Sequence, residues 1–179
     1  MTSRPLPGAF PDAQARPLTP PLTRARGLAA TVLDPELPHV TIEDLGILRD
    51  VTEDDQGRVH VTITPTYSGC PAMEAIRQDL VDILLTAGYQ RVDVEFVLAP
   101  AWTTDDMTDE ARAKLEDAGI APPGPVTHDA GAVALALAVR CPQCGSLDTR
   151  ESSRFGSTAC KSLWVCRSCR EPFDHFKAL

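Results

Sequence analysis

Four of the six cysteines form two Cys-x-x-Cys pairs near the C-terminal end of the sequence: Cys141 with Cys144, and Cys166 with Cys169. Each pair can present two thiolates on one tight turn, and 21 residues separate the two pairs. Four cysteines in this pattern are typical of a tetrahedral zinc site. The alternative is a pair of disulfides in a secreted domain. We predict a zinc ribbon over residues 132–179, with these four residues as ligands of a structural Zn²⁺ ion.

The predicted ribbon is too short to fold on a hydrophobic core alone, so we expect zinc to supply much of its folding free energy. The same segment contains a fifth cysteine, Cys160, which tetrahedral zinc does not need. Cys160 could be a spare thiol near the knuckles that exchanges with Cys166 or receives iron. It could equally be a buried structural residue, and the sequence does not decide between these interpretations.

The sixth cysteine, Cys70, lies in a loop rich in hydroxyl side chains, directly before Pro71. Proline is favoured at the first position of a helix, so Cys70 is expected at or near the N-cap of the helix that follows. The helix dipole and free backbone N–H groups would favour the thiolate there. Cys70 could therefore bind a metal, be a small buried hydrophobe, or act as a nucleophile with a histidine base. None of the four histidines has a position that nominates it as that base.

Charge is distributed unevenly along the chain, whose net charge is −8. Residues 28–139 hold six basic and twenty acidic residues, whereas residues 1–27 and 140–179 each carry a net charge of +3. An acidic central segment repels phosphate backbones, which disfavours nucleic acid as the main partner. We see no secretory signal and no apolar run long enough to span a bilayer. The sequence therefore predicts a cytoplasmic protein that has reduced thiols and does not bind membranes.

The spacing of apolar residues predicts an α+β domain over residues 22–125, preceded by a flexible Pro-rich tail at residues 1–21. The predicted order is αββαβα, which gives a small three-stranded mixed sheet covered by helices. Helices are expected over residues 22–33, 71–87 and 108–118, and strands over residues 47–51, 59–63 and 92–98.

Four segments of this domain together resemble the iron–sulfur carrier/assembly family: residues 34–38 (DPELP), 44–48 (DLGIL), 64–71 (TPTYSGCP) and 100–103 (PAWT). In the predicted ribbon, residues 155–161 (FGSTACK), the knuckle that follows them and residues 171–173 (EPF) resemble the D-subunit family of phenylacetyl-CoA epoxidase systems. The resemblance covers residues 28–179.

The resemblance implies an accessory or maturation role in aerobic phenylacetate catabolism, with oxygenase and reductase subunits as partners. It implies that Cys70 holds iron or an iron–sulfur cluster transiently. Since one thiolate cannot hold a cluster alone, a homodimer or a partner's ligands would have to complete the site. Asp34 and Glu36 belong to a family motif and offer oxygen ligands suited to iron, although turn formation alone would explain them. Cys160 is a further candidate.

Two other functions fit parts of the sequence. The ribbon could be a binding module that recognises nucleic acid and regulates transcription, although it lacks interleaved aromatic residues. The chain could also be a cysteine enzyme that forms a covalent adduct on Cys70. We expect the chain not to be catalytic itself.

Overall fold

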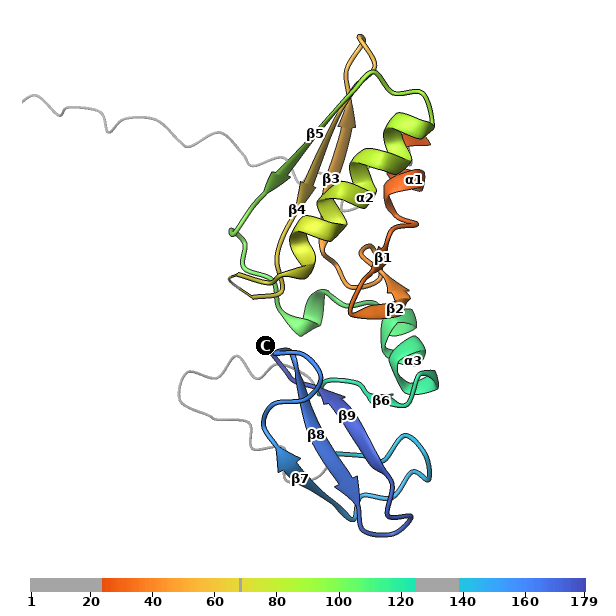
Figure 1. Cartoon of the computed structure of the whole chain (residues 1–179), viewed down its shortest axis with the longest axis vertical. Coiled ribbons are helices and arrows are strands. Elements are labelled where there is room, and N and C mark those ends of the chain that lie inside the picture. The colour runs from red at the N-terminus through yellow and green to blue at the C-terminus, as the bar shows by residue number, and fades with distance from the viewer. Residues whose placement is uncertain (1–23, 68, 125–138) are drawn as a thin grey trace, which may run out of the picture.

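The computed structural model describes residues 24–67, 69–124 and 139–179. Figure 1 shows an α+β part, coloured red to green, above a β-rich part in blue. We call residues 24–67 and 69–124 the body and residues 139–179 the ribbon. The predicted tail at residues 1–21 lies outside the described residues, as do residues 132–138 at the start of the predicted ribbon.

The central sheet of the body has three strands in the order β3 (Leu48–Glu53), β4 (Arg58–Ile63) and β5 (Arg91–Phe96). Strands β3 and β4 are antiparallel and are joined by a turn in which the Gly57 N–H donates to the Asp54 carbonyl at 3.0 Å. Strands β4 and β5 are parallel, so a helix must connect them. The predicted mixed α+β fold is confirmed.

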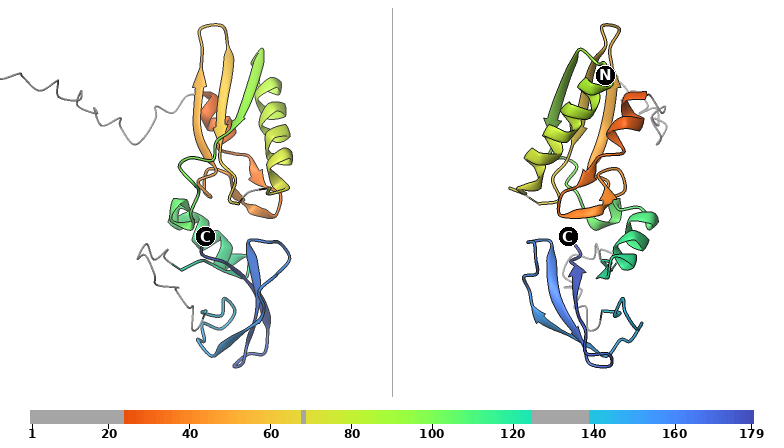
Figure 2. Two further views of the ribbon diagram at one scale, coloured as in Figure 1. Left: turned by 90° about the vertical axis from the view of Figure 1, so that its left-hand side faces the viewer. Right: turned by 45° about the vertical axis from the view of Figure 1, so that its right-hand side comes forward.

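Helices α1 (Arg24–Ala29) and α2 (Ala72–Thr86) cover one face of this sheet (Figures 1 and 2). The buried face of α2 includes Met73, Ile76, Leu80 and Leu84, as the helical spacing predicts. Helix α3 (Asp109–Asp117) begins at Thr108, whose hydroxyl accepts from the Ala111 N–H at 3.0 Å. Among the described helices, none is long and apolar enough to cross a membrane.

The helix predicted over residues 22–33 is wrong at its C-terminal end. It stops at Ala29, and the chain then forms a small antiparallel pair, β1 (Leu33–Asp34) with β2 (Leu37–Thr41). Pro35 disfavours helical geometry at Asp34, and the β-branched residues before it prefer extended backbone. The 3₁₀ helix η1 (Thr104–Asp106) was also not predicted.

The ribbon is built on a four-stranded sheet in the order β6-β9-β8-β7. Strand β8 (Lys161–Cys166) is antiparallel to both β7 (Thr149–Ser153) and β9 (Pro172–Phe176). Strand β6 (Ile120–Ala121) pairs in parallel with β9 and lies within the predicted α+β segment. The ribbon sheet therefore takes its edge strand from the end of the body.

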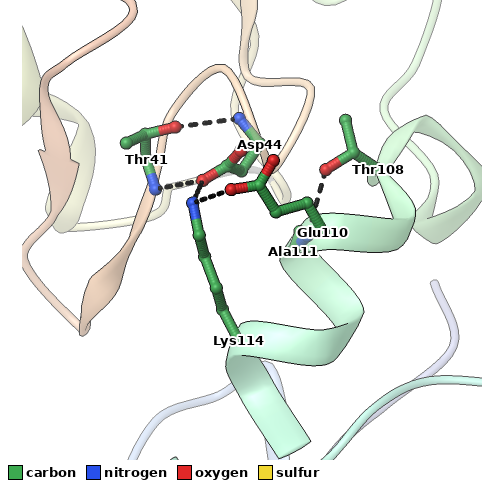
Figure 3. Close-up of polar contacts among 6 residues, drawn as sticks. All are labelled: Thr41, Asp44, Thr108, Glu110, Ala111 and Lys114. Atoms are coloured by element: carbon green, nitrogen blue, oxygen red, sulfur yellow. Dashed lines mark hydrogen bonds and ion pairs between the residues drawn. The ribbon is translucent and has the colours of Figure 1, made fainter. Parts of the chain in front are cut away.

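An ion-pair cluster fixes α3 to the loop after β2 (Figure 3). The Lys114 ammonium lies 2.7 Å from Asp44 Oδ2 and 3.0 Å from Glu110 Oε1. Asp44 Oδ2 also accepts from the Thr41 N–H at 3.1 Å. Burial tends to raise the pKa of Asp44, but the Lys114 and Thr41 hydrogen bonds outweigh it and lower the pKa. This contact positions α3 beside the segment that leads into β6.

Candidate functional site

The four knuckle cysteines converge on one point, with all four sulfur atoms within 4.8 Å of one another. Cys141 Sγ lies 3.7 Å from Cys169 Sγ, and Cys144 Sγ lies 3.6 Å from Cys166 Sγ. A tetrahedral zinc ion with bonds of about 2.3 Å requires sulfur–sulfur distances of roughly 3.8 Å. The residues therefore fit zinc. All six cysteines of the chain are free, which contradicts the disulfide alternative.

A hydrogen bond within the second knuckle favours the thiolate form of Cys166. The Cys169 N–H donates to Cys166 Sγ at 3.5 Å, and this bond contributes most to lowering the pKa of Cys166 to about 6. The hydroxyls of Ser146 and Ser168 are 2.8 Å apart and bridge the two turns. Four thiolates leave no open coordination position on zinc, so this centre is structural.

A second group of reactive side chains lies where the ribbon meets the body. A cavity of about 10 Å³ is lined there by Cys70, Asp34, Glu36 and Cys160, together with six other residues. We call it the junction cavity. It brings together the four residues that the sequence nominated for a cofactor, and 124 positions separate Glu36 from Cys160.

Cys160 is buried in the core of the body, although it belongs to the ribbon. Its Sγ lies 3.9 Å from Glu36 Oε2 and 3.0 Å from the Thr158 hydroxyl. Burial raises the pKa of the Cys160 thiol; the hydrogen bond with Thr158 opposes this rise, and the Glu36 carboxylate adds a smaller rise. Strand β8 runs from the next residue to Cys166, a span of roughly 20 Å. Cys160 is therefore distant from the zinc knuckles, and the structure does not place it as a spare thiol beside them.

The two carboxyl groups enter the cavity from the last residue of β1 and from the turn that follows it. Asp34 is buried, and its Oδ1 accepts from the Glu36 N–H at 2.8 Å, so it forms the turn as well as lining the cavity. Burial raises the pKa of both carboxyls, and the charge of Asp34 adds to the rise at Glu36.

Cys70 enters from the loop before α2. The N-cap of α2 is Pro71, so Cys70 lies one residue before the cap, and Pro71 is not the first helical residue as predicted. Cys70 is half-buried and packs against the body core. Tyr67, three residues earlier, has its pKa raised to about 12 by desolvation and then by Cys70, with smaller contributions from Glu36 and Cys160. Tyr67 is one of the hydroxyl side chains that the sequence places in the loop before Cys70, and the structure brings it close to this site.

Contacts between the ribbon and the body hold the junction together. The ring of Phe176 lies in the body core, edge-on to Trp102 with a centroid distance of 6.3 Å. The Trp102 indole N–H donates to the Leu45 carbonyl at 2.8 Å. Lys161 Nζ donates to the Glu36 carbonyl at 3.4 Å, and the Thr104 N–H donates to the Leu179 carbonyl at 3.2 Å. The ribbon is thus held against the body through its own buried residues.

Comparison with known proteins agrees with this division of the chain. Residues 26–96 match the family model "Iron-sulfur cluster assembly protein", and residues 126–177 match "PaaD zinc beta ribbon domain". A protein of Escherichia coli (strain K12), provisionally named as the D component of 1,2-phenylacetyl-CoA epoxidase, is 49% identical over 152 residues, which are 85% of this chain and 90% of that protein.

Two further relatives each match about half of this chain. An Fe-S protein maturation auxiliary factor of Porphyromonas gingivalis is 36% identical over 86 residues, or 48% of this chain and 81% of that protein. A crystal structure of a domain of unknown function, DUF59, from Bacillus anthracis covers 51% of this chain and 87% of its own, with 32% identity and a TM-score of 0.48. The match over nearly the whole of the E. coli protein shows that this chain belongs to the D-subunit family of phenylacetyl-CoA epoxidases, with an iron–sulfur assembly-type domain and a zinc ribbon.

Proposed function

We propose that this chain is an accessory factor that matures or repairs the iron–sulfur or di-iron centre of its partners in a phenylacetyl-CoA epoxidase system. Cys70 is its working thiol. The observation that carries the proposal is the junction cavity, in which two thiols and two carboxyl groups face the same small space. The names of the relatives, an epoxidase component and an Fe-S maturation factor, support the same role.

The size and composition of the junction cavity favour a small inorganic species over an organic substrate. A volume of about 10 Å³ is roughly the space that one water molecule needs, too small for a thioester substrate to enter. None of the residues that line it is a histidine, so the described lining provides no imidazole base for a cysteine nucleophile. These features support metal handling and disfavour the cysteine-enzyme alternative.

The partners we propose are the oxygenase and reductase subunits of the epoxidase system, in the cytoplasm. The alternative is a ribbon that binds nucleic acid. The ribbon's net charge of +3 is small beside the −14 of residues 28–139, so the chain as a whole repels a phosphate backbone. Salt-dependent DNA binding by the full chain would favour this alternative.

The test is to produce the partner oxygenase and reductase together with wild-type chain or with Cys70→Ala. The matched control is Met73→Leu, which changes another sulfur-containing residue of the same cavity wall but removes no thiol. We expect iron-poor, inactive partners with Cys70→Ala and fully loaded partners with Met73→Leu. Circular dichroism must show that both variants are folded. Fully loaded and active partners with a folded Cys70→Ala chain would refute the proposal.

A further inference from the structure

We propose that the ribbon supplies Cys160 as a ligand that completes, with Cys70 and Glu36, a transient site for one divalent ion of the Fe²⁺ class in the junction cavity. The biological role of the site rests on the proposed function, but the ligand assignment can be tested without it. The inference makes the ribbon part of the binding site and not only a structural or docking module.

The donor atoms come from three separate segments. Cys70 lies before α2, Glu36 lies between β1 and β2, and Cys160 directly precedes β8. All three line the same cavity, and the contact of 3.9 Å between Cys160 Sγ and Glu36 Oε2 already joins the ribbon's donor to one of the body. Two sulfurs and a carboxylate suit Fe²⁺, Co²⁺ or Zn²⁺ better than Mg²⁺ or Ca²⁺, which prefer oxygen ligands alone.

The size of the cavity favours a single ion over a cluster. Its volume of about 10 Å³ is close to the minimum for one water molecule. An iron–sulfur cluster contains several iron and sulfide atoms and takes about four protein ligands. The junction cavity is too small for these atoms, and two cysteines line it where about four would be needed. Binding of the ion displaces the thiol protons into solvent and involves no change of oxidation state.

The knuckle centre and the proposed site in the junction cavity differ in how close together their donor atoms lie. In the part of the chain that the structure describes, only the knuckle cysteines form a group of three or more such ligands within 4.8 Å. Cys70, Cys160 and Glu36 must therefore move closer around an ion, and three protein ligands leave a coordination position open. A site that closes on its ion and remains open at one position can release that ion to a partner, unlike the closed knuckle centre.

The position of Cys160 depends on the folded ribbon. The Cys160 carbonyl accepts from the N–H of Lys177 at 2.9 Å, so the residue that directly follows β9 holds the backbone that carries the thiol. Strand β8 then leads directly to the zinc ligand Cys166 at its other end. Zinc binding at the knuckles therefore anchors the strand that presents Cys160 to the body.

The experiment is an anaerobic titration of Co²⁺ into the full chain already loaded with zinc. Co²⁺ is the probe because it gives a thiolate-to-metal charge-transfer absorption and binds such ligands more weakly than zinc does, so it does not displace the knuckle ion. We expect one Co²⁺ per chain with thiolate absorption, while the zinc content stays at one per chain. Cys160→Ser and Cys70→Ser should each weaken Co²⁺ binding by at least about tenfold and reduce that absorption to that of one thiolate. Phe155→Ala, which changes an exposed ribbon residue outside the cavity lining, should bind Co²⁺ as wild type does.

Two results would overturn the assignment: no Co²⁺ bound beyond the zinc, or a folded, zinc-loaded Cys160→Ser that binds Co²⁺ like wild type. The failure of the assignment can be separated from failure of the proposed function. If partners are iron-poor with Cys70→Ala but fully loaded with Cys160→Ser, the maturation role stands and the ligand role of Cys160 is wrong. If partners are loaded with both variants, the maturation role itself fails.

Discussion

Replacement of Phe176 by alanine should separate the ribbon from the body. The Phe176 ring is 1% exposed and packs edge-on against Trp102, with ring planes at 63°. Removing a buried aromatic ring costs about 3–5 kcal/mol. About 0.5–1.5 kcal/mol of that belongs to the aromatic pair. Because whole domains are stable by only about 5–15 kcal/mol, this loss is large enough to undock the ribbon.

Urea unfolding measures the loss of stability, and the reaction of Cys160 with a thiol reagent measures undocking. The second assay uses a zinc-loaded Cys70→Ser background, so that Cys160 is the one thiol outside the zinc site. The matched control is Phe155→Ala, because Phe155 is also in the ribbon but is 75% exposed. Its contact is with Lys177 at 5.6 Å, which is worth about 0.5–1 kcal/mol at an exposed position.

We expect Phe176→Ala to be destabilised by several kcal/mol and to label faster at Cys160, whereas Phe155→Ala should lose no more than about 1 kcal/mol. A double-mutant cycle with Trp102→Leu should give a coupling energy of about 0.5–1.5 kcal/mol. Equal stability of the two phenylalanine variants, or a coupling energy of zero, would show that the docked arrangement is wrong.

Three further predictions concern pH, zinc and the α3 contact. Burial lowers the pKa of His175 to about 4, so the stability it contributes is complete above pH 6.5 and is lost as pH falls towards 4. Urea unfolding should show that the free energy of unfolding falls by roughly 1.4 kcal/mol between about pH 7.5 and pH 5.5. His175→Gln should abolish this loss, whereas His60→Gln, the control at an exposed site, should retain it. Cys144→Ser should lower the zinc content and unfold the ribbon locally; zinc content and circular dichroism equal to wild type would contradict the structural zinc site. Lys114→Met should cost about 1–2 kcal/mol in urea unfolding because it leaves the half-buried Asp44 carboxylate without its 2.7 Å partner, and an unchanged midpoint would count against that contact.

The helices and strands predicted from the sequence were those in which the spacing of apolar residues follows one uninterrupted period or in which a cap marks the start. Strand β4 alternates cleanly, α2 has a full apolar face, and α3 carries its cap at Thr108. Strands β1 and β2 were missed because Pro35 and Pro38 interrupt the pattern and the strands are short. Strand β6 has two residues, too few for any period to appear.

For the candidate site, the sequence indicates which residue types could bind a metal. It does not indicate which of them lie close together in the fold. The knuckle spacing predicts which four cysteines converge, because each pair lies on one local turn. The contact between Cys160 and Glu36 joins positions 124 residues apart and depends on how two sheets dock. The position of Phe176 in the body core, which fixes that docking, has no local signal in the sequence.

The body and the ribbon each contribute residues to the other part, and the pairing of β6 with β9 is one of these contributions. Ala121, from the end of the body, is buried in the ribbon's own core, while Cys160 and Phe176 of the ribbon are buried in the body's core. A cut anywhere between residues 125 and 138 would therefore remove the edge strand β6 from the fragment that contains the ribbon. It would also expose apolar side chains of the body's core on the other fragment. Limited proteolysis should yield fragments that stay associated, and a genetic recombination that swaps the ribbon alone would have to restore both contacts before the hybrid could fold.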